Sequence, residues 1–147
     1  MRAIDLIVIH CSSTRENYAL TEQALEASHR LIGFDGTGYH FYVRRDGRVL
    51  TTRPVSRVGA HVRGYNAHSI GICYEGGLDR YGNPKDTRTE WQRHSLSVLV
   101  GKLLQEYPGT CVVGHRDLSP DLNGNGEVES MEWTKQCPCF DVGKEFW

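Results

Sequence analysis

A chain of 147 residues, 39% of them hydrophobic, has the size of one compact domain with its own core. The formal net charge is −1 and the pI is near 6.6, so no overall field would draw the chain to nucleic acid or to an anionic membrane. The N-terminal apolar stretch is short and is interrupted by Asp5, which does not fit a signal peptide or a membrane span. We therefore expect no export by the ordinary route.

The first half of the chain predicts a strand, a helix and a hairpin, in that order. "AIDLIVIHCS" is an apolar, β-branched run that predicts a buried strand with His10 near its C-terminal end. A helix is expected from about residue 21 to residue 32, with Leu25, His29 and Ile32 at helical spacing. The Asp46-Gly47 pair between "YHFYVRR" and "RVLTT" predicts a hairpin with a two-residue turn.

The second half predicts two further strands around a long helix. "NAHSIGICYEGG" and "TCVVGH" are the strands, and the second one ends on His115. "TEWQRHSLSVLVGKLLQEY" is the helix, with a capping box of Thr89 and Gln92 and with apolar residues along one face, namely Leu96, Leu99, Val100, Leu103 and Leu104. There is no repeat or linker. This order predicts an α/β fold, a single domain over residues 1–147 with a central mixed β-sheet flanked by helices.

Two predicted strands end on a histidine, and a cysteine lies further along the chain. Either histidine alone would equally suit a hydrogen-bonded strand end, because a lone histidine carries little information. Together with Cys137 in "KQCPCFD", His10 and His115 provide two imidazoles and one thiolate, a set that suits zinc and leaves a fourth position for water. Such a zinc lowers the pKa of bound water from 15.7 toward about 7. The spacing is not that of a zinc finger, so spacing alone indicates a metal only weakly.

Five motifs in order resemble a known family over nearly the whole chain, from about residue 5 onward. They are "IVIHCSST", "GYHFYVRRDGRV", "GAHVRGYNAHSIGICYEGG", "VVGHRD" and "KQCPCFD". The sequence resembles the zinc-dependent N-acetylmuramoyl-L-alanine amidases of the phage-lysozyme type, relatives of the peptidoglycan recognition proteins. The resemblance implies an amidase/peptidoglycan recognition protein-like fold. It also implies a hydrolase that cleaves the amide between N-acetylmuramic acid and the first L-alanine of the peptide stem, as in cell-wall lysis or remodelling.

The resemblance also assigns roles to individual residues. It places His10, His115 and Cys137 as zinc ligands, and Tyr39 and Lys135 as catalytic residues. A fixed positive charge on Lys135 suits the oxyanion that forms during amide hydrolysis. Tyr39 could hydrogen-bond the attacking water or relay a proton, although a pKa near 10 makes it a poor base. Without the motif, Tyr39 would be read as a core aromatic residue.

Softer roles follow for other polar residues and for the remaining cysteines. In the family that the chain resembles, the stretch holding His61 and Asn66 lines the substrate groove, so we expect both to bind substrate. Cys139 lies two residues after Cys137 and could also reach a metal, but the family has its ligand before the proline. The other three cysteines are expected to be core thiols, and the odd number does not indicate a disulfide framework: Cys11, Cys73 and Cys111.

The expected partner is peptidoglycan or its muropeptide fragments, bound by a monomer, with no nucleic acid and no membrane insertion. Without a visible export signal, we expect the chain to stay in the cytoplasm until it is released or delivered to the cell wall. The alternative is a non-catalytic peptidoglycan-binding module. Binding-only relatives commonly lack the cysteine ligand, whereas this chain has Cys137, so the enzyme is favoured.

Residues 120–133, "PDLNGNGEVESMEW", resemble a calcium loop and lie as an insertion between His115 and Lys135. The candidate oxygen ligands for Ca²⁺ are Asp121, Asn123, Asn125, Glu127, Glu129 and Glu132. Pro120 opposes an incoming helix, so an EF-hand sensor is not expected. The open alternatives are a calcium ion that stiffens the segment before Cys137 and an ion-free cluster of turns.

Overall fold

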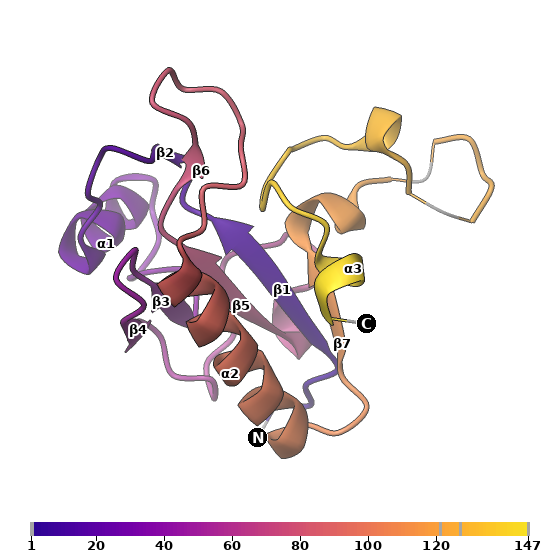
Figure 1. Cartoon of the computed structure of the whole chain (residues 1–147). Coiled ribbons are helices and arrows are strands. Elements are labelled where there is room, and N and C mark those ends of the chain that lie inside the picture. The colour runs from indigo at the N-terminus through magenta and orange to yellow at the C-terminus, as the bar shows by residue number, and fades with distance from the viewer. Residues whose placement is uncertain (1, 121, 127, 147) are drawn as a thin grey trace.

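The computed structural model describes residues 2–120, 122–126 and 128–146, which fold around one mixed β-sheet (Figure 1). The five strands lie in the order β4-β3-β5-β1-β7, and a separate pair is formed by β2 and β6. The bounds are β1 Leu6–Cys11, β2 Thr14–Arg15, β3 Phe41–Val43, β4 Val49–Thr51, β5 Ser69–Tyr74, β6 Gly77–Leu78 and β7 Cys111–Gly114. The α/β architecture expected from the sequence is therefore confirmed.

Strand β1 is an interior strand of the sheet, between β5 and β7. It pairs in parallel with β5 on one side and with β7 on the other, and β3 is parallel to β5, while β4 is antiparallel at the far edge. The register places Ile9 opposite Gly114, the last residue of β7. Because β1 and β7 run in the same direction, His10 and His115 emerge at the same edge of the sheet.

The described residues form three α-helices, of which α1 and α2 begin and end close to where the sequence predicts, while α3 was not predicted. They are α1 Glu22–Leu31, α2 Glu90–Glu106 and the short α3 Val142–Phe146, and single 3₁₀ turns occur at η1 Asn66–His68, η2 His115–Leu118 and η3 Ser130–Glu132. Helix α2 has the predicted capping box, in which Thr89 Oγ1 accepts the Gln92 N–H and the Gln92 side chain accepts the Thr89 N–H. Gln92 also donates to the carbonyls of Val43 and Glu75, which ties α2 to the sheet.

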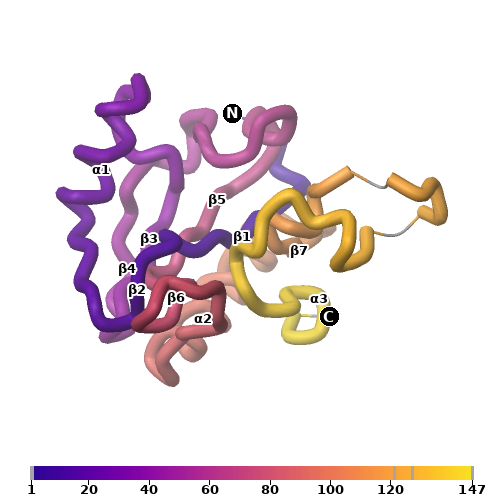
Figure 2. Tube along the Cα trace, turned by 90° about the horizontal axis from the view of Figure 1, so that it is seen from above, coloured from indigo at the N-terminus to yellow at the C-terminus, as the bar shows by residue number. Residues whose placement is uncertain are grey.

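The two faces of the sheet have different roles. Ile7 and Ile9 point to the face that packs against α2 and α3, where the main hydrophobic core lies. A smaller cluster of Leu25, Tyr42 and Cys73 joins α1 to the opposite face. In Figure 2, which shows the chain from above, α1 lies well away from α2 and α3. Because side chains alternate along a strand, His10 points to the α1 face, away from the main core.

Three details differ from the sequence predictions. The hairpin has a three-residue connection, because the Arg44 N–H reaches the Arg48 carbonyl and Gly47 adopts φ +90°, the geometry of a turn with a glycine bulge. Ile32 does not join the core; its side chain is 68% exposed at the end of α1. Cys111 is exposed rather than buried, because it begins the edge strand β7.

The segment that carries Cys137 is fastened to the domain from two sides. Tyr74 Oη, at the end of the central strand β5, donates to the Pro138 carbonyl at 2.5 Å. The Arg88 guanidinium lies 3.3 Å from the centre of the Phe140 ring and pairs with Asp86 and Glu145. These buried contacts fix the C-terminal segment against the sheet edge. Among the described residues, no helix is long and apolar enough to cross a bilayer.

Candidate metal centre and active site

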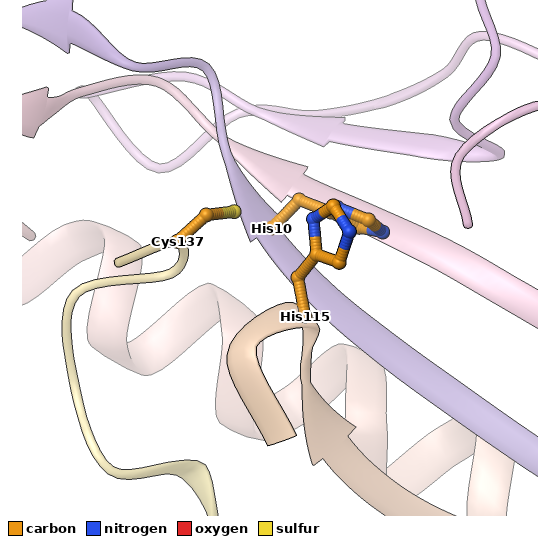
Figure 3. A group of neighbouring side chains, drawn as sticks. All are labelled: His10, His115 and Cys137. Atoms are coloured by element: carbon orange, nitrogen blue, oxygen red, sulfur yellow. The ribbon is translucent and has the colours of Figure 1, made fainter. Parts of the chain in front are cut away.

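His10, His115 and Cys137 converge at the C-terminal edge of the sheet (Figure 3). His10 is the penultimate residue of β1, and His115 directly follows β7. The two Nδ1 atoms are 3.2 Å apart, and the ligand atoms of all three residues lie within 4.8 Å of one another. Within the described part of the chain, this is the one group of three or more such side chains that could hold a metal.

Backbone hydrogen bonds hold these three residues in register. The Cys11 N–H donates to Cys137 Sγ at 3.1 Å, and the Arg116 N–H donates to the Cys137 carbonyl at 2.8 Å. Asp117 accepts the Gly114 N–H at 2.8 Å, so its carboxylate caps the turn after β7. Cys139 Sγ instead lies 3.3 Å from the Gly77 carbonyl and is outside the group of three.

The surroundings keep both imidazoles neutral, which is the form that binds metals. His10 is 1% exposed; burial, followed by the nearby charges of His61, His115 and Lys135, lowers its pKa well below the ordinary value. Burial and the Lys135 ammonium lower the pKa of His115 to about 4. At neutral pH each ring therefore has a nitrogen lone pair available to a cation.

Tyr39 and Lys135 border the same cleft, which has a volume of about 260 Å³ and is also lined by His115 and Cys137. The Tyr39 ring lies 5.0 Å from the His10 ring, between centroids. Burial raises the pKa of the Tyr39 phenol well above its ordinary value, so it keeps its proton and acts as a hydrogen-bond donor. Tyr39 precedes β3 rather than lying within it, and Lys135 is exposed.

His61 lines this cleft and Asn66 lies beside it, and the polar atoms of both side chains make hydrogen bonds within the protein. His61 Nδ1 is 2.9 Å from His10 Nε2, and His61 Nε2 is 3.0 Å from Ser69 Oγ. Asn66 Oδ1 accepts the backbone N–H groups of His61 and Val62, both at 2.9 Å. A shallower groove next to the cleft includes Asn66, His61 and Arg63. Proximity to a substrate groove is thus observed, and contact with substrate stays a prediction.

His29 also lines the cleft, although the sequence alone predicts no functional role for it. Its Nδ1 accepts the Gly38 N–H at 2.8 Å, and its ring lies 5.3 Å from that of Tyr39. His29 therefore braces the segment leading to Tyr39. The sequence contains a signal for this contact, because His29 lies in the last turn of the helix that precedes the Tyr39 motif and can contact that motif. His40 is buried, and its Nδ1 accepts the Gly71 N–H at 3.0 Å, which gives it a structural role between β3 and β5.

The calcium-loop resemblance does not produce a cation cage among the described residues. Glu132 is 3% exposed, and its carboxylate accepts the backbone N–H groups of Leu122, Asn123 and Glu129. The side-chain amides of Asn123 and Asn125 donate to Glu129. Carboxylate oxygens that would bind Ca²⁺ are thus engaged by N–H donors, the ion-free alternative. Two of the candidate ligands, Asp121 and Glu127, lie outside the described residues.

Comparison with known proteins identifies the family. The family model described as N-acetylmuramoyl-L-alanine amidase matches residues 1–139. The chain belongs to this amidase family. An endolysin of Klebsiella phage KP32 is 36% identical over 141 residues, which cover 96% of this chain and 83% of the endolysin. The chain is thus an amidase related to phage endolysins.

Solved structures agree with this amidase assignment. The N-acetylmuramoyl-L-alanine amidase LysC from Clostridium intestinale URNW superposes with a TM-score of 0.74 at 29% identity, over 98% of this chain and 82% of LysC. Bumblebee PGRP-SA gives the same TM-score of 0.74 at 20% identity, over 99% of this chain and 81% of that one, and so shows a shared fold. The amidase/peptidoglycan recognition protein-like fold expected from the sequence is confirmed.

Proposed function

We propose that this amidase hydrolyses the amide between the lactyl group of N-acetylmuramic acid and L-alanine in peptidoglycan, using a zinc ion held by His10, His115 and Cys137. The observation that carries the proposal is the meeting of these three donors, two of which (His115 and Cys137) line the cleft, in a chain of the amidase family. The three side chains come from three separate segments, so their convergence is a property of the fold.

The donor set fits zinc. Tetrahedral zinc with bonds of 2.0–2.1 Å to nitrogen places two ligand nitrogens about 3.3 Å apart, and the Nδ1 atoms of His10 and His115 are 3.2 Å apart. Two lone-pair nitrogens this close, beside a thiol sulfur, are a poor arrangement unless a cation lies between them. When bound, zinc would activate water and polarise the amide carbonyl. Three protein ligands would leave a position open, as in catalytic zinc sites.

Stabilisation of the oxyanion and orientation of the reacting groups are assigned to Lys135 and Tyr39, which both line the cleft. Amide hydrolysis develops negative charge on the carbonyl oxygen, and the exposed Lys135 ammonium provides a positive charge that can approach this oxygen. Tyr39, which lines the cleft, keeps its proton, so its phenol can donate a hydrogen bond that orients the reacting groups.

The alternative is a non-catalytic binding module. Such a module would need neither the complete set of three zinc donors nor the positive charge of Lys135 beside it. This chain has both histidines and Cys137, with Lys135 at the rim of the same cleft. The complete donor set therefore supports catalysis over binding alone.

The test is release of soluble, alanine-terminated peptide stems from purified peptidoglycan. The zinc-loaded protein should release them, a chelator should abolish release, and added zinc should restore it. Cys137→Ala should be inactive, while Cys111→Ala, a change of an exposed cysteine outside the cleft, should be fully active. A zinc-loaded protein that releases no stem, or a Cys137→Ala variant as active as wild type, would overturn the proposal.

The proposed enzyme acts on the cell wall as a monomer, after the chain has been released or delivered to it. The cleft is formed entirely by residues of one chain, so a second copy is not needed to complete it. Light scattering during gel filtration of the zinc-loaded protein should give the mass of a single chain, and a dimer mass at micromolar concentration would contradict this part of the proposal.

A further inference from the structure

We propose that His61 is a positioning residue for His10: it accepts the Nε2–H of His10 and thereby keeps Nδ1 of His10 free and aimed at the metal. The inference rests on the proposed zinc site and assigns to His61 a role different from the substrate contact expected from the resemblance. Its consequence is that His61 sets the zinc affinity of the site.

Three polar side chains, His10, His61 and Ser69, form a chain of hydrogen bonds on the α1 face of the sheet. His10 Nε2 lies 2.9 Å from His61 Nδ1, and His61 Nε2 lies 3.0 Å from Ser69 Oγ. The two rings meet edge to face, with an interplanar angle of 85°. His10 and Ser69 are buried, at 1% and 0% exposure, so water does not substitute for these contacts. Both ring nitrogens of His61 are thus engaged inside the protein.

The direction of the hydrogen bonds follows from the metal. If His61 donated to His10, the remaining proton of a neutral His10 would be on Nδ1, the atom that faces His115 Nδ1 at 3.2 Å. That arrangement would place a proton where the cation must bind. If His10 donates a hydrogen bond through Nε2, its Nδ1 keeps a lone pair. His61 then donates a hydrogen bond through its own Nε2–H to Ser69 Oγ. Only this second arrangement is compatible with a metal on His10 Nδ1.

The fold leaves a slot of the right size for the His61 ring. A Cβ atom on Gly71 of β5 would lie 2.7 Å from His61 Cγ, and one on Gly59 would lie 2.9 Å from His61 Cδ2. The backbone of His61 is held by Asn66 Oδ1, which accepts the N–H groups of His61 and Val62. Ring and backbone are therefore both fixed, as expected for a group that orients a metal ligand.

Zinc affinity separates this role from a purely structural one. Competition of the purified protein with a fluorescent zinc chelator should show 10- to 100-fold weaker binding for His61→Phe, the usual range for loss of a partner of a metal ligand. His61→Asn can place its Oδ1 where Nδ1 lies, and it should recover most of this loss. His94→Asn, on the exposed surface of α2, should bind zinc as wild type does. Circular dichroism identifies any variant that fails to fold.

Imidazole nitrogen NMR provides the second readout, because it reports which ring nitrogen of His10 carries the proton. The zinc-loaded wild type should show a slowly exchanging proton on His10 Nε2, and this signal should be lost or exchange rapidly in His61→Phe. A proton absent from Nε2 in the wild type, or equal zinc affinity in wild type, His61→Phe and His61→Asn, would overturn the inference alone. A wild-type protein that binds no zinc would overturn the proposed function as well.

Discussion

His10 and His115, 105 residues apart in the sequence, bring their Nδ1 atoms to 3.2 Å of one another. The parallel pairing of β1 with β7 produces this approach, because Ile9 lies opposite Gly114 and the next residue of each segment is a histidine. Cys137 joins them from a segment fixed by the Arg116 N–H and by Tyr74 Oη. Two of the three proposed zinc ligands thus depend on strand register, and the third depends on the attachment of a loop.

Loss of Cys137 should remove the metal, whereas loss of Cys139 should not. Cys137→Ala takes away one of three protein ligands, so bound zinc after dialysis should fall from about one ion per chain to near zero. Cys139 Sγ contacts the Gly77 carbonyl instead, and Cys139→Ala should keep its zinc. Elemental analysis of the dialysed proteins measures both. Zinc retained by Cys137→Ala but lost from Cys139→Ala would reassign the ligand.

Lys135→Gln should lower kcat by about 10² to 10³ with little change in zinc content, because it removes a charge that stabilises the developing oxyanion. Tyr39→Phe removes the phenol hydroxyl of a residue that lines the cleft and should lower kcat by about 10² or more. Lys102→Gln, an exposed change on α2, is the matched control. Steady-state hydrolysis of a soluble muropeptide gives these values. A loss confined to KM would show that the two side chains bind substrate without assisting the reaction.

The metal-free protein should lose stability between pH 6.5 and pH 4, in part through His40. Burial lowers the pKa of His40 to about 4, while an unfolded histidine has a pKa near 6.5. Between these values the unfolded chain binds the proton and the folded chain does not, so the free energy of unfolding falls as the pH falls.

The contribution of His40 should be roughly 2–3 kcal/mol between pH 7 and pH 4.5. Urea titrations of chelator-treated wild type, His40→Gln and His94→Gln at these two pH values measure it. His40→Gln should show a smaller drop with acid than wild type, whatever its stability at pH 7, and His94→Gln should resemble wild type. An equal drop in His40→Gln and wild type would contradict the assignment.

Gly71→Ala should weaken zinc binding without touching any proposed ligand. Its Cβ would lie 2.7 Å from His61 Cγ, so the His61 ring has to move and its bond to His10 is lost or distorted. We expect a loss of affinity of order 10-fold in the chelator competition. Gly101→Ala in α2 meets no atom within 4 Å and should keep wild-type affinity, with a gain in stability of up to about 1 kcal/mol. Equal affinity in the two variants would show that the His61 slot tolerates a methyl group.

Glu132→Gln should destabilise the segment before Lys135, with or without calcium. The buried carboxylate accepts three backbone N–H groups, and the neutral amide offers only one acceptor oxygen, so we expect a loss of about 1–3 kcal/mol. Millimolar CaCl₂ should leave the melting temperature of the zinc-loaded wild type unchanged, as measured by scanning calorimetry. A rise in wild type that is absent from Glu132→Gln would restore the calcium loop.

The sequence by itself predicted helices α1 and α2, the five strands of the main sheet and the three proposed zinc donors. Apolar runs predicted β1 and β7, the Thr89–Gln92 box predicted the start of α2, and five ordered motifs indicated the amidase family that the comparisons confirm. These features are local, or they depend on motif order, so a single sequence contains them. The same local reading gave the calcium-loop pattern, which names oxygen atoms without saying what already binds to them.

Only the tertiary structure decided how the donors meet and what stands behind them. Strand register aligns His10 with His115, and the folded chain places His61 Nδ1 against His10 Nε2. The Glu132 carboxylate is directed to backbone amides in the same way. Each of these contacts joins atoms whose approach depends on packing and on hydrogen bonds of the whole fold. A residue's type in the sequence states what it can bind, and its neighbours in three dimensions decide what it does bind.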